Sequence, residues 1–404
     1  MNFVFDSYQT LALASLVLLL GYFLVKRISV LKAFNIPEPV VGGFIVAIGL
    51  LIWHQINGVH FTFDKNLQNT MMLVFFTSIG LSANFARLIK GGKPLVIFLF
   101  AAGLLIVCQN TIGVVGAELL GIDPAYGLLA GSVTLTGGHG TGAAWADTFA
   151  QAFNLPAATE IAMACATFGL VFGGILGGPV ARYLLNHQKQ GENPENDEVD
   201  DIQEAFEHPT YKRKVNARSI IETIAMMSIC LLIGQYLDGI TKGTAIQLPT
   251  FVWCLFTGVI MRNTLTHLFK FQVADSAIDV LGSVGLSIFL AIALMSLKLW
   301  ELAGLATDVM VILAIQVAFM AFFAIYVTYR MMGKDYDAIV LSAGHCGFGL
   351  GATPTAVANM QAITSRFGPS HKAFLIVPMV GAFFIDLINA ALLKVFFGVV
   401  SFLH

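Results

Sequence analysis

The chain has 404 residues, of which 57% are hydrophobic and only 11% are charged, and its formal net charge is −2. Soluble globular proteins carry about 25% charged residues, so this composition excludes an ordinary soluble domain and suits a chain whose main solvent is lipid. The mean hydropathy of +0.80 points the same way. The small net charge gives no reason to expect a nucleic-acid partner.

Taken in chain order, the apolar runs predict ten membrane-spanning helices, because a helix needs about 20 apolar residues to cross a bilayer. The first run follows Asp6 and precedes Lys26 and Arg27. A cleavable signal peptide has the opposite order of charges, so we expect this run to remain as a membrane helix with its N-terminus outside. The predicted spans are 8–25, 39–57, 69–86, 94–117, 157–181, 219–237, 248–266, 276–297, 309–329 and 373–397.

Three further stretches do not fit this pattern. Residues 127–153 and 338–364 are too rich in Gly, Thr, Ser and Pro to be ordinary spans. Each is predicted to be a broken, re-entrant helical hairpin that enters and leaves the membrane on one side. Residues 186–218 carry an acidic block followed by a basic block, which is typical of a solvated linker.

The basic residues set the predicted orientation. If the ten spans alternate and both hairpins return to the side they entered from, all but Lys65, Lys242, Lys298 and Lys394 of the 22 Lys and Arg residues lie on the cytoplasmic side. Five spans then precede the linker and five follow it, and an odd number inverts the second half. The predicted fold is therefore an all-α integral membrane protein. It has a first repeat at 1–185, a cytoplasmic linker at 186–218 and an inverted second repeat at 219–404, and both termini lie outside.

The sequence also carries a trace of this duplication. When residues 121–182 are shifted forward by 212, identical residues meet and both interrupted stretches fall in register. Chance matches in Gly- and Ala-rich helices explain part of the agreement. The matching pairs include Gly121 with Gly333, Asp123 with Asp335, Gly137 with Gly349, Thr141 with Thr353, and Gly169 with Gly381.

The broken hairpins are the predicted transport site. An unpaired backbone N–H or C=O costs several kcal/mol in hydrocarbon, so a broken helix is tolerated only inside protein or beside water. A break offers carbonyl oxygens to a cation and half-helix N-termini to an anion, and paired breaks in inverted halves indicate a binding site. The predicted tips are Gly137, Gly138 and Gly140 in the first hairpin and Gly347, Gly349 and Gly351 in the second. The predicted substrate-binding residues are Thr136, Gly137, Gly138, His139, Gly140, Thr141, Gly349, Gly351, Thr353 and Thr355.

Several polar residues are candidates for the coupling ion, and each has a structural alternative. Asp386 lies near the middle of the last span, where a carboxylate marks an ion or proton site or else bonds the broken backbone. Asp147 and Asn359 correspond under the shift of 212 and either offer oxygen to sodium or sit at wet hairpin ends. His139 and His345 lack further ligands for zinc and are open to a proton relay or a ligand hydrogen bond. The predicted sodium or coupling residues are Ser132, Thr134, Asp147, Gly344, His345, Asn359, Asp386 and Asn389.

Other small residues are predicted to serve packing. Gly169, Gly173 and Gly177 recur every four residues, as in close helix–helix contacts. The five cysteines lie in apolar stretches without a CxxC pair, which implies neither disulfides nor zinc.

At these motifs the sequence resembles the bacterial sodium/glutamate symporters over essentially its whole length. The resemblance is carried by EPVVGG at 38–43, LTGGHGTGAAW at 135–145 and GHCGFGLGATPTAVANM at 344–360. It implies sodium-driven glutamate uptake across the bacterial inner membrane, with sodium as the coupling ion and no organic cofactor. It also implies an inverted-repeat fold related to sodium/citrate carriers, a homodimer, and an elevator-like movement of the hairpin-bearing domain. The tip reads GGHG here and GGNG-like in the sodium/citrate carriers, which favours the glutamate branch.

Two other interpretations remain open at this stage. The first is a sodium- or proton-coupled carrier of another carboxylate such as citrate. The second is an intramembrane enzyme or a channel. Asp147 and Asp386 lack the GxGD context of an aspartyl pair, and inverted halves suit alternating access better than a symmetric pore.

Overall fold

The computed structural model describes residues 2–34, 36–85, 92–187, 215–242, 244, 248–297 and 305–403. Nearly all of these residues are helical, and each predicted span coincides largely with one helix or with a helix interrupted by a short π-helical turn. The predicted linker at 186–218 lies mostly outside the described residues. α9 (Ala158–His187) and α11 (Ala217–Thr241) flank it.

Eight helices in the described ranges are long and apolar enough to cross a membrane. The two other predicted spans are α4 (Lys65–Ser82) and α12 (Thr250–His267), which have 18 residues each and polar side chains at one or both ends. The chain is thus a helical membrane protein with several spans, while the count of ten stays a prediction. The eight are α1 (Ser7–Arg27), α3 (Glu38–Asn57), α6 (Gly92–Leu120), α9, α11, α13 (Asp275–Met295), the run from α14 (Ala306–Phe323) through η2 (Ala324–Thr328) to α15 (Tyr329–Met331), and α19 (Ile385–Leu403).

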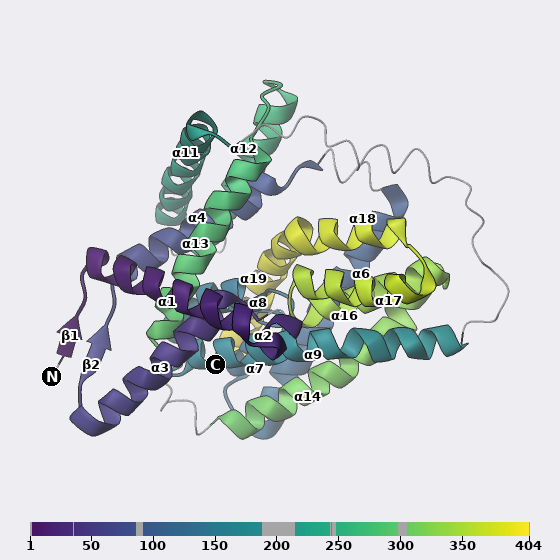
Figure 1. Cartoon of the computed structure of the whole chain (residues 1–404), viewed down its shortest axis with the longest axis horizontal. Coiled ribbons are helices and arrows are strands. Elements are labelled where there is room, and N and C mark those ends of the chain that lie inside the picture. Colours follow the sequence, from purple (N-terminus) through teal and green to yellow (C-terminus); the bar gives the residue numbers. More distant parts are fainter. Residues whose placement is uncertain are drawn as a thin grey trace.

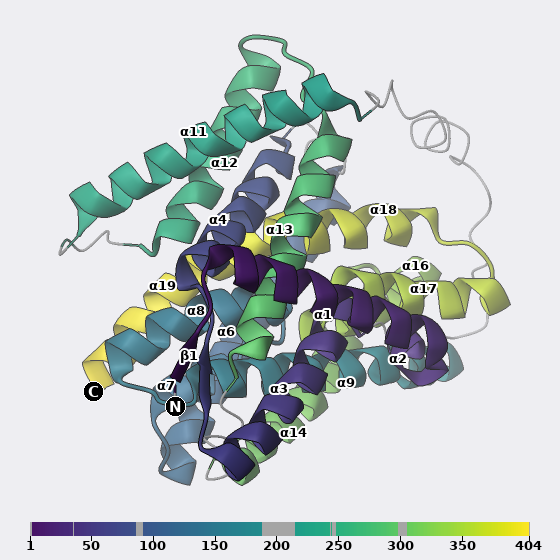
Figure 2. The ribbon, with the colours of Figure 1, turned by 60° about the vertical axis from the view of Figure 1, so that its left-hand side comes forward.

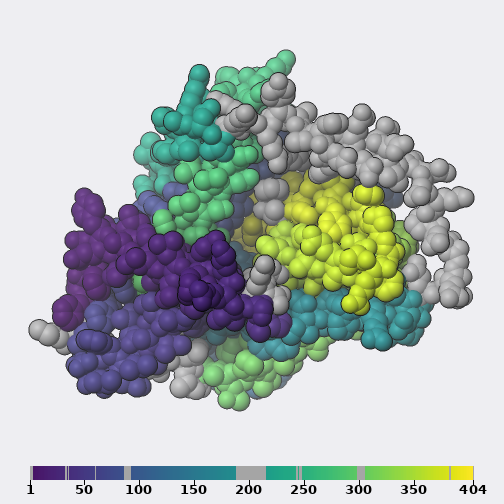
Figure 3. Space-filling model, in the orientation of Figure 1, coloured from purple at the N-terminus to yellow at the C-terminus, as the bar shows by residue number. Residues whose placement is uncertain are grey.

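The helices form two groups that each mix both halves of the chain (Figures 1 and 2). In the first group, α4 packs between α12 and α13, and α3 packs against both α1 and α13. In the second group, α6 and α9 surround the hairpin helices together with α14. Figure 3 shows the N-terminal helices at the left of one face and the segment around residues 353–379 to their right on the same face. The hairpin helices are α7 (Pro124–Leu129), α8 (Gly138–Phe153), α16 (Tyr336–Leu350) and α17 (Thr353–Phe367), and α18 (His371–Met379) with η3 (Val380–Phe384) leads into α19.

The same local signals begin both hairpins. Gly121 and Gly333 both have positive φ angles, +71° and +113°, which glycine adopts without strain. Two residues later, Asp123 accepts a hydrogen bond from the amide of Ala125, and Asp335 accepts one from Ala338. Aspartate is among the preferred residues at this capping position. The register of 212 residues therefore holds at the entrance of each hairpin.

A short pair of strands, which was not predicted from the sequence, holds the N-terminal residues against the segment that precedes α4. β1 (Asn2–Val4) pairs in parallel with β2 (His60–Thr62). Beside it, the Ser7 hydroxyl and the amides of Leu67 and Asn66 donate to Asp64 and hold the pKa of that carboxyl below its usual range. Asp64 thereby caps α4 and fixes it to the start of α1.

Candidate functional site

The first hairpin is interrupted over residues 130–137, between α7 and α8. The backbone there forms irregular turns, in which the amide of Gly137 bonds the carbonyl of Ser132 and the amide of Gly138 bonds that of Thr134. Gly138 then begins α8 with φ +67°. The predicted break is confirmed, but it lies mainly before the glycines that were expected to form the tip, and Gly140 and Thr141 belong to the first turn of α8.

The second hairpin breaks later than predicted. α16 continues through Gly347 and Gly349 to Leu350, and the interruption is at Gly351 and Ala352. Placing Gly347 and Gly349 at the tip was therefore wrong. A Cβ on Gly347 would overlap the backbone of Ala356, so this glycine serves the close contact of α16 with α17. Thr353 and Pro354 open α17, and proline suits a first helical turn.

The two breaks meet inside the protein, and one side chain joins them. The Nε2 of Gln109 on α6 donates to the carbonyl of Gly349 at 2.7 Å, while its Oε1 accepts from the Thr136 hydroxyl at 2.7 Å. A Cβ added to Gly138 would lie 3.3 Å from the carbonyl oxygen of Gly351. Glycine suits position 138 because of the positive φ, and the neighbouring backbone leaves little room for a side chain.

The last helix also holds the first break. Ser132 donates its hydroxyl to Oδ1 of Asn389 at 2.7 Å, and Nδ2 of Asn389 donates back to the carbonyl of Ser132 at 3.1 Å. The amide of Ser132 bonds Oδ1 of Asn110 at 3.0 Å. Asp386 lies one turn before Asn389, and its carboxylate has no hydrogen-bond partner within the described part of the chain. The structural hydrogen bond considered for Asp386 is therefore made by Asn389.

Three amides at this junction were missed from the sequence. Gln109 and Asn110 lie in the middle of α6, and Gln316 in the middle of α14 donates to the carbonyl of Gln109 at 2.7 Å. All three are buried. Asp386 was predicted to be functional because it is a polar residue inside an apolar span. The same criterion would have identified these three amides.

The two histidines do not come together. Nε2 of His139 lies 3.0 Å from the Thr167 hydroxyl, whose proton goes to the carbonyl of Met163, so the ring nitrogen is the donor. His345 is enclosed by the rings of Phe98, Phe323 and Phe348, and its Nδ1 pairs with the hydroxyl of Thr328 at 2.8 Å. His345 thus belongs to the packed core of α16.

Several other predicted residues lie where helices touch. Nδ2 of Asn359 donates to the carbonyls of Gly173 and Ala343, which links α17 to α9 and α16. Gly344 meets Met360 of α17. The packing role of the glycine series on α9 is confirmed, since a Cβ at Gly169, Gly173 or Gly177 would contact α16 or α17.

The threonines at the helix starts point in different directions. A Cβ on Gly381 would lie 2.9 Å from the Thr353 hydroxyl, so Thr353 faces η3. Thr355 is buried against α9, and its hydroxyl has no partner among the described residues.

The hydroxyl of Thr134 donates to the carbonyl of Leu129 and stabilises the first break. Thr141 is buried on α8.

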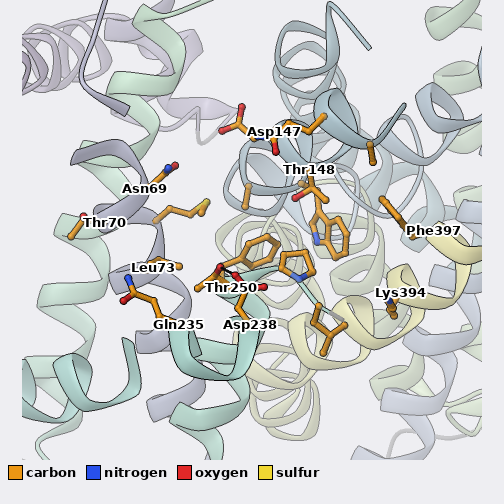
Figure 4. Close-up of a pocket in the computed structure, with 18 of the residues that line it drawn as sticks. Asn69, Thr70, Leu73, Asp147, Thr148, Gln235, Asp238, Thr250, Lys394 and Phe397 are labelled. Atoms are coloured by element: carbon orange, nitrogen blue, oxygen red, sulfur yellow. Dashed lines mark hydrogen bonds between the residues drawn. The ribbon is translucent and has the colours of Figure 1, made fainter. Parts of the chain in front are cut away.

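A cavity of about 820 Å³ lies between the two helix groups. Figure 4 shows α8 and α19 on one side of it, with Asp147, Thr148, Lys394 and Phe397, and α4, α11 and α12 on the other. Asp147 thus lines this cavity, whereas its sequence counterpart Asn359 lies away from it, where α17 meets α9 and α16. Its lining includes Trp145, whose ring meets that of Phe251 edge-on at 5.6 Å between centroids.

This arrangement suits small charged solutes. The starts of α8 and α17 present backbone N–H groups without intrahelical partners, which favour a carboxylate. The breaks, Asp386 and nearby hydroxyls offer hard oxygen atoms of the kind that bind alkali and alkaline-earth cations. No group of three or more His, Cys, Asp or Glu side chains at ligand distance occurs in the described ranges.

Comparison with known proteins identifies several that are similar to this chain. Residues 3–369 match the family model described as Sodium/glutamate symporter. A Sodium/glutamate symporter of Haemophilus influenzae is 84% identical over 403 residues, all of both chains, and one of Escherichia coli is 55% identical over 394 residues, 98% of each. A sodium proton antiporter of Methanocaldococcus jannaschii matches in structure with a TM-score of 0.44 and 12% identity, over 97% of this chain and 98% of that one.

The relatives are named as transporters and not as enzymes. The family model covers most of the chain, and both curated relatives match along nearly their whole length. The chain therefore belongs to the sodium/glutamate symporter family.

Proposed function

We propose that this protein carries glutamate into the cell together with sodium, across the bacterial inner membrane. The observation that carries the proposal is the meeting of two interrupted helices around Gln109, at a point where both cation and carboxylate can be held by backbone dipoles. The names of relatives at 84% and 55% identity support the choice of solute and ion.

Within this proposal, the solute binds at the starts of α8 and α17, and sodium binds at the breaks. The N–H groups from His139 to Thr141 and those of Thr353 and Thr355 face the carboxylates. Asp386 supplies sodium with a carboxylate that is free of other described partners, and Asn389 keeps the neighbouring break in shape. Thr355 adds a buried hydroxyl that lacks a partner among the described residues.

We also propose that the hairpin-bearing group moves against the other group in an elevator-like manner. A Cβ on Gly140 of α8 would lie 2.8 Å from the Phe75 ring on α4 and 3.2 Å from Leu286 on α13, so apolar side chains line this boundary. The cavity between the groups is the path by which the solute reaches α8. With the predicted topology, the cavity opens outward, since it lies at the start of α4 and between α11 and α12.

The repeat, the topology and the dimer belong to the same proposal. Three helices, a long helix, a hairpin and a final helix follow one another in each half of the chain. The matched signals at Gly121 with Gly333 and at Asp123 with Asp335 support a duplication, with first repeat 1–185 and second repeat 219–404. We propose that the halves are inverted, that both termini are periplasmic, and that the protein is a homodimer.

Uptake of radiolabelled glutamate into liposomes tests the proposal. We expect uptake to need an inward sodium gradient and to rise with an inside-negative potential, which contributes about 2.3 kcal/mol per charge at −100 mV. One glutamate with one sodium is electrically neutral, so a response to the potential requires additional sodium. Asp386→Asn should raise the sodium concentration for half-maximal uptake, while Glu118→Gln at the exposed end of α6 should not.

Three outcomes would contradict the proposal. If a proton gradient without sodium drives uptake equally well, the coupling ion is the proton and not sodium. If the protein takes up citrate in preference to glutamate, glutamate is not its main solute. An unchanged sodium dependence of Asp386→Asn would remove that residue from the ion site.

A further inference from the structure

The cavity between the helix groups contains an unusual set of charges. Among its described lining residues, two are carboxylates, Asp147 on α8 and Asp238 on α11, and one is a cation, Lys394 on α19. The remaining polar lining is neutral, and apolar rings of Trp145, Phe251 and Phe397 complete the wall. An anion entering this cavity meets two like charges and one opposite charge.

Lys394 is also exceptional by its position. It is one of four basic residues that the predicted topology leaves off the cytoplasmic side. Of the two carboxylates, Asp238 already accepts a hydrogen bond from the Thr250 hydroxyl at 2.6 Å. No described residue forms an ion pair with Lys394, and its side chain is half-buried. A cation held between low-dielectric walls focuses its field into the cavity and raises the local concentration of anions.

The helix that carries Lys394 also reaches the breaks. Lys394 follows Asn389 by five residues, which corresponds to about 8 Å along the helix axis. Asn389 is bonded to Ser132 of the first break, so the helix that carries Lys394 at the cavity also contacts the junction of the two hairpins. In Figure 4, Lys394 lies on the same wall as Phe397, opposite the residues of α4 and α11.

We propose that Lys394 is the residue that receives the carboxylate of an anionic solute in the cavity, before the solute reaches the broken helices. This inference rests on the proposed function and adds to it a specificity-determining residue outside the hairpins. The ammonium offsets the repulsion from Asp147 and Asp238, so neutral and cationic amino acids gain less from it than a dicarboxylate does. Lys394 then acts chiefly on the rate at which the solute associates with the cavity, and on KM.

The test compares Lys394→Gln with Lys242→Gln in liposomes. Lys242 ends α11 at the same end of the molecule, is exposed, and does not line the cavity. We expect Lys394→Gln to lower kcat/KM for glutamate about 10-fold at low ionic strength, mainly through KM, and only about 2-fold when choline chloride is added at constant sodium. Lys394→Arg should retain most of the wild-type value, and Lys242→Gln should change it less than 2-fold.

The outcomes separate this inference from the proposed function. If the wild-type protein shows no sodium-driven glutamate uptake, the proposed function fails and the inference with it. If the wild-type protein transports glutamate, the inference alone fails in any of three cases: an unchanged kcat/KM of Lys394→Gln, a loss equal to that of Lys242→Gln, or a loss confined to kcat and independent of salt. Lys394→Met keeps an apolar side chain of similar length. If the glutamine variant is unstable, the same measurements on Lys394→Met test the inference.

Discussion

At the scale of single residues, the junction of the two hairpins depends on an amide that both donates and accepts. Gln109 presents Nε2 to the carbonyl of Gly349 and Oε1 to the hydroxyl of Thr136, so one side chain satisfies groups from both breaks. Buried backbone groups must be paired, and a break leaves some without partners in their own helix. A glutamine in the middle of α6 is therefore part of the site even though it lies on neither hairpin.

Gln109→Ala should destabilise the protein by about 1–2 kcal/mol, because it leaves the Gly349 carbonyl with only the 3.3 Å contact to Thr136. Thermal unfolding in detergent measures the change. Thr111→Ala is the matched control, since Thr111 lies on the same helix, is exposed, and its hydroxyl bonds the carbonyl of Val107 within that helix. Equal unfolding temperatures of Gln109→Ala and the wild-type protein would contradict the structural role.

At the scale of elements, α9 and α16 approach so closely that glycine is needed along their contact. A Cβ on Gly169 would overlap the carbonyl oxygen of Leu350, the last residue of α16 before the second break. Gly173, one turn on, would meet the carbonyl of Gly347 at 3.1 Å. α9 thus supports the end of the broken helix through its backbone.

Gly169→Ala should cost about 1–3 kcal/mol, because the added methyl group forces two helix backbones apart. It should also reduce transport, since the second break would shift. Gly174→Ala lies on the same helix and brings only an ordinary contact with Thr355 at 3.5 Å, so we expect wild-type stability from it. Unfolding temperatures and initial uptake rates check both variants, and equal behaviour of the two would refute the packing argument.

At the scale of the whole molecule, the boundary between the two helix groups contains the cavity on one side and apolar contacts on the other. Gln151 of α8 lines the cavity and is exposed, and it belongs to the hairpin-bearing group. If this group moves inward with its solute, Gln151 must leave the outer water.

A single cysteine at Gln151, in a chain freed of its five native cysteines, tests that movement. We expect a membrane-impermeant thiol reagent added outside to label Gln151→Cys, and labelling to slow several-fold once sodium and glutamate are both present. Lys242→Cys, at the end of α11, should be labelled at the same rate in both conditions. Constant labelling of Gln151→Cys would rule out the elevator-like movement.

The sequence by itself determined the membrane class, the positions of the helices and the existence of two interrupted hairpins. Apolar runs and glycine-rich interruptions are local features, and the motifs at 135–145 and 344–360 identified the family before any tertiary contact was considered. The capping signals at Asp123 and Asp335 were equally local.

Only the tertiary structure decided where each break lies and what holds it. Gly347 and Gly349 were predicted to form a tip, yet both are helical, and a Cβ on either would meet atoms of a neighbouring helix, so these glycines serve packing. Residues 130–137 lose regular helix although most of them are not glycine, because Asn110, Asn389 and Gln316 supply hydrogen bonds from other helices. A backbone group is satisfied by whatever partner lies nearest in space, and that partner can be more than 200 residues away along the chain.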